Sequence, residues 1–178
     1  MDLTPNSEQE SFVAATADWC RDNLPLEQAR SRPAGLWYQL EAMGWTGMTA
    51  PGMDLDHATE ALVFAELGRH IAPVALLSTA VAARWAGHAG KTALALLDRD
   101  MPGTMARVFD PHGAELALGL VAGVVATSVL PADLDGQPGL DPAAPLAHLQ
   151  PAPPLAAIGA GEAALHLQLR SAAFAAGA

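Results

Sequence analysis

The residues best suited to chemistry are histidines and one cysteine, but their spacing matches no familiar catalytic or metal-binding motif. No two histidines lie four residues apart on a predicted helix, and none stands beside a carboxylate at a zinc-ligand spacing. We therefore expect each histidine at the surface or at a helix end. The six are His57, His70, His88, His112, His148 and His166. Cys20 falls on the apolar face of the first predicted helix, so we expect a core residue, not a nucleophile.

Two glycine-containing segments partly match phosphate-binding motifs. In 87-GHAGKTAL-94, a P-loop would require glycine where Trp85 stands, and a predicted helix precedes the segment in place of a strand. We interpret it as a connection between helices with a solvated Lys91. The segment 159-GAGEAA-164 fits G-x-G-x-x-A, but no acidic residue follows about 20 residues later. Two glycines opening an alanine-rich helix explain it better.

The remaining candidates also lack a catalytic setting. Ser128 lies in a predicted buried strand and has no G-x-S-x-G context. Asp98, Asp100 and Asp110 form a loose acidic group that is typical of a solvated helix end. The residues alone therefore predict no catalytic residue and no metal ligand, and they leave any cofactor-binding residues unknown.

Composition limits the possible partners. The chain is 51% hydrophobic and 16% charged, so it can bury a core. Its formal net charge of −10, with nine Lys plus Arg, disfavours binding to nucleic acid or to anionic membranes. The longest apolar run, 116–130, is shorter than the ~20 residues of a membrane-spanning helix. One cysteine excludes an internal disulfide, and the acidic, polar start shows no signal peptide, so we expect a cytoplasmic protein.

Helical patterns dominate the first half of the chain. A first helix should begin with a capping box formed by Ser7 and Glu10 and end at Leu24. Further helices are expected at about 33–43, from Asp54 or Asp56 to 70, at 74–86, and as a short segment at 91–97. Between the second and third helices, an apolar loop from Trp45 to Met53 should either pack beneath other residues or form the lip of a pocket.

The second half changes character. The segments 104–109, 116–130 and 146–150 read as strands, with a turn or bulge inside the valine-rich run 116–130. Helical periodicity returns over 155–178. We therefore predict a mainly α chain with a small β region, an α+β fold. Its domains should be 1–98, helical; 99–154, a reduced β and loop region; and 155–178, the start of a C-terminal helix. Because alanine supplies little burial, we expect the chain to need a partner.

Three strings resemble segments of the acyl-CoA dehydrogenase family, and their order and spacing agree with the family across residues 3–85. The string 40-LEAMGWTGMTAP-51 resembles the family's L-x-x-L-G-W-x-G-L-x-x-P segment. The string 60-EALVFAELGRHIAPVALLSTAVAA-83 is similar to the stretch that follows it there, and 3-LTPNSEQESFVAATADWCRDN-23 resembles the family's first helix. The segment 162–178 resembles the opening of the first helix of the family's C-terminal bundle.

The resemblance implies an N-terminal helical domain, a β-domain and a C-terminal four-helix bundle. It also implies FAD between the β-domain and the bundle, with an acyl-CoA beside it. In the family's reaction, a carboxylate removes the α-proton and the β-hydride passes to the flavin. This chain departs from that pattern, because the β region is short, the flavin-contacting Thr-Glu-Pro and Gly-Ser-Asp stretches have no equivalent, and the bundle is nearly absent. No catalytic or cofactor residue of the family can be carried over.

Three functional readings follow. In the first, the chain is a shortened acyl-CoA dehydrogenase-like subunit that is inactive alone and pairs with a complete flavoprotein. In the second, it is the N-terminal fragment of an ordinary acyl-CoA dehydrogenase. In the third, it is a non-enzymatic helical scaffold or acyl-binding module. The expected partners are a flavin-bearing subunit or a second copy, and an acyl-CoA or a carrier-bound acyl group, without nucleic acid or membrane. FAD would be held mainly by the partner or by the missing region. Leu165, Leu169 and Phe174 should form an apolar face that mediates association.

Overall fold

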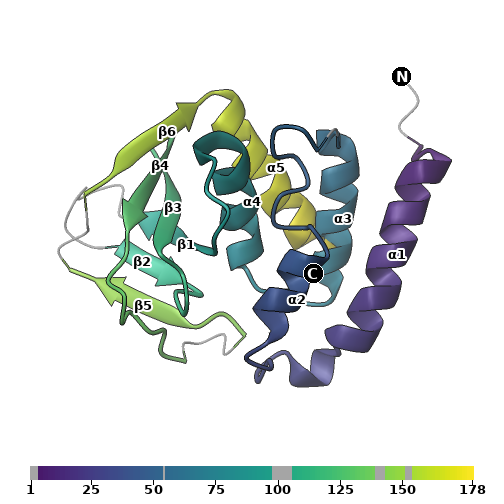
Figure 1. Ribbon diagram of the computed structural model, residues 1–178, viewed down its shortest axis with the longest axis horizontal. Coiled ribbons are helices and arrows are strands. Elements are labelled where there is room, and N and C mark those ends of the chain that lie inside the picture. Colours follow the sequence, from purple (N-terminus) through teal and green to yellow (C-terminus); the bar gives the residue numbers. More distant parts are fainter. Residues whose placement is uncertain (1–3, 54, 98–105, 139–142, 151–153) are drawn as a thin grey trace.

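The computed structural model describes residues 4–53, 55–97, 106–138, 143–150 and 154–178. Its helices gather on one side of a six-stranded mixed sheet, as predicted for an α+β chain (Figure 1). In chain order the elements are α1 Ser7–Asn23, the 3₁₀ helix η1 Leu26–Gln28, α2 Leu36–Ala42, α3 His57–Arg69, α4 Ala75–Ala86, β1 Thr92–Leu97, β2 Ala106–Phe109, β3 Leu116–Val121, β4 Val124–Val129, β5 Leu146–Leu149, β6 Ala156–Ala160 and α5 Glu162–Gly177.

Local capping signals set the helix ends. The capping box of α1 joins Asn6 and Gln9, so the predicted pair of Ser7 and Glu10 was wrong by one residue. Asp56, one of the two predicted caps, is the N-cap of α3, and its side chain accepts a hydrogen bond from the Thr59 amide at 2.7 Å. These caps satisfy amides that the first turn of each helix leaves without partners.

The apolar loop between α2 and α3 both packs inward and borders a pocket. Trp45 and Met48 are buried, and the Trp45 and Trp19 rings pack in a T-shaped arrangement at a centroid distance of 4.8 Å. Pro51 and Met53 instead line a surface cavity together with residues from the end of α4. Both predicted roles of this loop are therefore present, at different residues.

The sheet has the strand order β5-β2-β1-β3-β4-β6, and β1 and β3 are its parallel pair. The valine-rich run forms the hairpin β3–β4, as predicted. Its turn places Ala122 and Gly123 at φ values of +50° and +81°. Strand β5 confirms the predicted strand near 146–150, and β2 confirms the described part of the predicted strand at 104–109.

Two predicted helical segments are strands. Residues predicted as a short helix at 91–97 form β1, whose Thr92 amide donates to Thr79 Oγ1 at 2.9 Å. The predicted C-terminal helix does not begin at 155, because 156–160 form β6 and α5 starts only after Gly161 at φ +55°. Short runs of alanine, leucine and glycine have too little hydrophobic periodicity to distinguish a helix from a strand. Pairing with neighbouring strands determines that these segments are strands.

Lys91 and Asp110 are not the solvated residues that the sequence predicts. Their side chains form an ion pair at 2.7 Å with exposed fractions of 10% and 15%, and Lys91 also lies 5.0 Å from the centre of the Trp37 ring. The pair links the segment after α4 to the end of β2. Asp98 and Asp100, which were grouped with Asp110, lie outside the described residues.

Helix α5 is the element that joins the two halves of the fold. It lies between α3 and α4 and follows directly from β6 (Figure 1). Leu165 and Leu169 on its outer face are 64% and 41% exposed, as expected for an uncovered face. Phe174 instead packs against the helical core, so the predicted apolar face is smaller than the sequence suggested. Among the described residues, no helix combines the length and hydropathy needed to cross a membrane.

Candidate functional site

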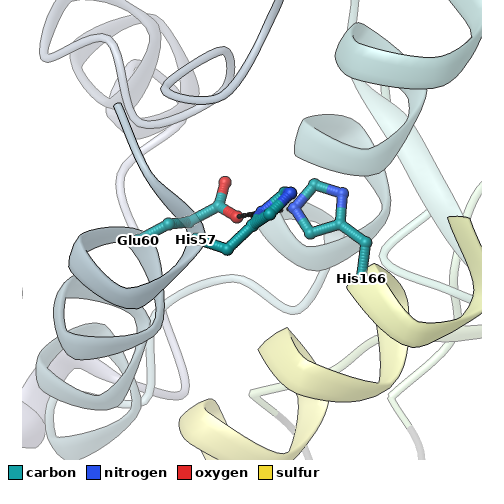
Figure 2. Close-up of side chains that lie close together, drawn as sticks. All are labelled: His57, Glu60 and His166. Atoms are coloured by element: carbon teal, nitrogen blue, oxygen red, sulfur yellow. Dashed lines mark hydrogen bonds and ion pairs between the residues drawn. The ribbon is translucent and has the colours of Figure 1, made fainter. Parts of the chain in front are cut away.

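A buried polar cluster joins α3, α5 and the loop between α2 and α3. Glu60 comes from the first turn of α3, and His166 and Arg170 lie one turn apart on α5. Thr49 comes from the loop. All four are nearly inaccessible: Glu60 and Arg170 are 0% exposed, Thr49 is 2% and His166 is 3%. Figure 2 shows His57 and Glu60 of α3 facing His166 of α5.

Each oxygen of the Glu60 carboxylate has its own partners. Oε1 pairs with the guanidinium of Arg170 and accepts the Thr49 hydroxyl at 2.9 Å. Oε2 lies 2.5 Å from His166 Nε2. Arg170 Nη2 also donates to Thr49 Oγ1 at 3.1 Å, which closes the network. Burial lowers the pKa of Arg170, but the adjacent carboxylate favours the charged guanidinium, so we treat the two groups as an ion pair.

The hydrogen bonds determine the tautomer of His166. Trp85 Nε1 can only donate, and it lies 3.0 Å from His166 Nδ1. Nδ1 therefore accepts, and the ring proton sits on Nε2, where it is donated to Glu60. Burial, and then the nearby positive charge of Arg84, lower the pKa of His166 to about 4. A second proton would have to enter at Nδ1, where the Trp85 N–H already points.

His57 is neutral at pH 7 for similar reasons. Its ring centre lies 4.3 Å from that of His166 in an edge-on arrangement, and its Nδ1 lies 3.4 Å from Glu60 Oε2. Partial burial lowers the pKa of His57, and His166, Arg84 and Arg170 lower it further. The cluster thus contains two neutral imidazoles and one compensated ion pair.

A cavity of about 570 Å³ opens beside this cluster. Its lining combines the two imidazoles with one cation, one acid and two leucines: His57, Arg84, Glu162, Leu165, His166 and Leu169. Arg84 Nη1 donates to the Thr49 carbonyl at 2.5 Å, and its guanidinium lies 5.3 Å from the centre of the Trp85 ring. Within the described part of the chain, no carboxylate forms an ion pair with Arg84.

The two histidines and Glu60 have the donor types of a transition-metal site. One ligand atom from each lies within 4.8 Å of the other two. Two contacts argue against a metal ion here. Trp85 keeps the proton on His166 Nε2, so that nitrogen has no free lone pair, and Arg170 already neutralises the only anionic ligand. We therefore interpret the cluster as a hydrogen-bonded network, and the predicted absence of metal ligands stays a prediction.

The sequence predictions for individual side chains have mixed outcomes. His57 begins α3 and His70 ends it, and His112 and His148 are exposed, as expected, but His166 is buried and its prediction was wrong. The missed signal was the pair of helical spacings, His57 with Glu60 and His166 with Arg170, which puts each pair on one helix face.

Cys20 is a buried core residue, as predicted. Burial, followed by the charge of Glu66, raises the pKa of its thiol to about 12, so the reactive thiolate is disfavoured. Ser128 is also buried, and its hydroxyl donates to the Pro154 carbonyl at 2.8 Å. Neither residue has the environment of a nucleophile.

The described residues do not by themselves fit a whole FAD. A cavity of about 330 Å³ lies between the sheet and α5, where the family resemblance would place the flavin. Its lining is apolar apart from Gln168 and Ser171, and it contains no cation for the cofactor's pyrophosphate. We derive no step through this cofactor from these residues.

Comparison with known proteins agrees with this architecture. Residues 6–92 match the family model described as acyl-CoA dehydrogenase, N-terminal domain. No curated protein matches the sequence. Among solved structures, the chain is similar to one in the ChsE4-ChsE5 complex from Mycobacterium tuberculosis, at 15% identity and a TM-score of 0.66 over 98% of this chain and 64% of that one.

Two further structures have the same fold. One is a putative acyl-CoA dehydrogenase from Mycobacterium smegmatis, at 14% identity and a TM-score of 0.56, covering 98% of this chain and 63% of that one. The other is the prolyl acyl carrier protein oxidase AnaB, at 15% identity and a TM-score of 0.57, covering 94% and 63%. The chain thus spans less than two thirds of the length of these solved chains. Residues 6–92 match the acyl-CoA dehydrogenase N-terminal domain model, and the chain shares the fold of these solved structures.

Proposed function

We propose that this chain is an acyl-CoA dehydrogenase-like subunit that contributes to the flavin-dependent α,β-dehydrogenation of an acyl thioester. It acts together with a complete flavoprotein and is inactive alone. The observation that carries this proposal is the combination of the family's fold with a cavity at the expected flavin position that is too small and too apolar for FAD. FAD is then held mainly by the partner or by further polypeptide.

Pairing with a second subunit has structural support. The matched Mycobacterium tuberculosis structure is a complex of two proteins, ChsE4 and ChsE5. The exposed Leu165 and Leu169 on α5 also give this chain an apolar surface for association, either with such a subunit or with a second copy.

A second candidate is the N-terminal fragment of an ordinary acyl-CoA dehydrogenase. The chain spans only 62–64% of the solved chains it matches, which favours this reading. An intact mass of the native gene product separates the two candidates, because a fragment belongs to a longer polypeptide and a short subunit does not.

The proposed function predicts that activity appears only in the complex. The chain should be purified alone and after co-expression with the acyl-CoA dehydrogenase encoded nearest to it, and flavin absorbance and acyl-CoA-dependent dye reduction should be measured on both. We expect a colourless, inactive chain and a yellow, active complex. The flavoprotein expressed without this chain is the control and should be less active.

Robust dye reduction by the isolated 178-residue chain would contradict the inactive-alone proposal. Failure of the chain to recruit any flavoprotein would contradict the pairing.

A further inference from the structure

Among the residues that the structure describes, no carboxylate forms an ion pair with Arg84. Arg84 is half-buried near the end of α4, where its guanidinium contacts the Thr49 carbonyl oxygen and the Trp85 ring. Its Nε is buried and has no hydrogen-bond partner among the described residues. Glu162 lines the same cavity, but the two side chains form no ion pair within the described residues. A partly desolvated guanidinium of this kind favours an anion that can accept several of its N–H groups.

Apart from the exposed Glu162, the polar lining is electrically neutral, and the Glu60 carboxylate beside it is already paired. The charge of Glu60 is compensated by Arg170, and His57 and His166 are held neutral by burial and by neighbouring cations. Of the lining residues, Arg84 alone therefore offers a fixed positive charge to a ligand. The cavity volume of about 570 Å³ lies within the usual range for small-molecule sites.

The apolar part of the lining lies along α5. Leu165 and Leu169 are one helical turn apart, both contribute to the cavity, and both remain exposed. A ligand with an apolar chain would cover these side chains and remove their surface from water, which favours binding.

We propose that this cavity binds a carboxylate carried on an apolar chain. The carboxylate accepts hydrogen bonds from the guanidinium of Arg84, and the chain lies along Leu165 and Leu169. A planar carboxylate matches the fork of an arginine, and its single charge matches that of one uncompensated guanidinium. The inference rests on the cavity and needs neither flavin nor a partner subunit. A partner docked on Leu165 and Leu169 would compete with the ligand for these side chains, so binding to the isolated chain tests the inference separately from the proposed function.

Calorimetric titration of the isolated chain with octanoate, and with 1-octanol as the neutral analogue, tests the proposal. Octanoate should bind about tenfold more tightly than octanol, because the charged hydrogen bonds to Arg84 are present only with the carboxylate. Saturable binding at a one-to-one ratio is expected. Absent octanoate binding, or equal affinity for the two molecules, would overturn the proposal.

Three charge-removing variants should change the affinity for octanoate in three different ways. Arg84→Gln should weaken octanoate binding about tenfold and leave octanol binding unchanged. Glu162→Gln removes a repelling carboxylate from the lining and should tighten octanoate binding about twofold. Arg21→Gln removes an exposed arginine on α1, whose partner is Asp18, and should change nothing. Equal effects of Arg84→Gln and Arg21→Gln would mean that only net charge matters, and the site assignment would be wrong.

A second pair keeps the proposal testable if Arg84→Gln does not fold, as judged by circular dichroism. Leu165 is 64% exposed, so Leu165→Gln and Leu165→Glu should both fold. The two variants differ only by a charge in the cavity. Octanoate should bind the glutamate variant more weakly than the glutamine variant, and octanol should bind both equally. Equal octanoate affinities would count against binding in this cavity.

Discussion

His166 and Arg170 can be buried because each finds its partners on another segment of the chain. His166 lies between an acceptor on α3 and a donor on α4, and Arg170 pairs with Glu60 and Thr49. A buried polar group without such partners would cost roughly 1–3 kcal/mol, and a buried charge more. Two nitrogens of Arg170, Nε and Nη1, have no hydrogen-bond partner in the described part of the chain, although the guanidinium lies 4.9 Å from the centre of the Phe64 ring.

The lowered pKa of His166 predicts a loss of stability in mild acid. The folded-state pKa of about 4 lies below the unfolded value near 6.5, so the unfolded chain binds the extra proton first as pH falls. Stability should therefore be highest above about pH 6.5 and decrease toward pH 4, with about 2 kcal/mol lost by pH 5. Urea unfolding at pH 7.5, 6 and 5 measures this.

His166→Gln is the control, because glutamine does not titrate in this window. Its unfolding free energy should be lower at pH 7.5 but should change less between pH 7.5 and 5. An equal slope in the two proteins would show that His166 is not the group responsible.

Because Glu60 and Arg170 form a buried ion pair, removing one of the two charges should destabilise the fold more than removing both. Glu60→Gln leaves the guanidinium buried without its counter-charge and should lower the unfolding free energy by about 3–5 kcal/mol. The double variant Glu60→Leu with Arg170→Met removes both charges and should be less destabilised. Glu27→Gln, on the exposed η1, should have almost no effect. A cost for Glu60→Gln no larger than that for Glu27→Gln would contradict the assigned pairing.

Among elements, α3 and α5 approach each other closely at two glycines. A Cβ added at Gly68 of α3 would lie 2.0 Å from the Phe174 carbonyl oxygen of α5, and one at Gly177 would lie 1.7 Å from that of Ala65. These glycines therefore allow the helix backbones to come together, and this approach brings the polar side chains within hydrogen-bonding distance.

Gly68→Ala should separate the two helices and lower the unfolding free energy by about 1–3 kcal/mol, despite the higher helix propensity of alanine. Gly35→Ala is the matched control, because nothing lies within 4 Å of the added Cβ and its backbone is not left-handed. Thermal unfolding of both variants measures the effect, and Gly68→Ala should have the lower transition temperature. If both have the same transition temperature, the helices tolerate a side chain at Gly68 and their packing is looser than described.

For the whole molecule, the outer face of α5 determines how the chain associates. Leu169→Glu places a charge on the exposed apolar surface and should convert an oligomer or heteromer into a monomer. Light scattering coupled to gel filtration measures the mass. Leu26→Glu is the control, since Leu26 is 52% exposed on η1, outside this face. An unchanged assembly in Leu169→Glu would contradict association through this face.

The sequence by itself determined the family resemblance, the α+β class and the main helices. Local signals were sufficient there, because caps such as Asp56 and the apolar repeats of α1 to α4 act within a few residues. The hairpin of β3 and β4 was also readable from its valines and its glycine turn. The proposed domain boundaries at residues 98 and 154 stay predictions.

Only the tertiary structure decided that 92–97 and 156–160 are strands, that His166 is buried, and that Lys91 and Asp110 form a largely shielded ion pair. Alanine-rich strands obtain their structure from neighbouring strands and not from their own periodicity. The polar cluster depends on Glu60 and His166, which are 106 residues apart in sequence. Such contacts form only when α5 packs against α3, and no local sequence pattern can indicate a contact between residues so far apart in the chain.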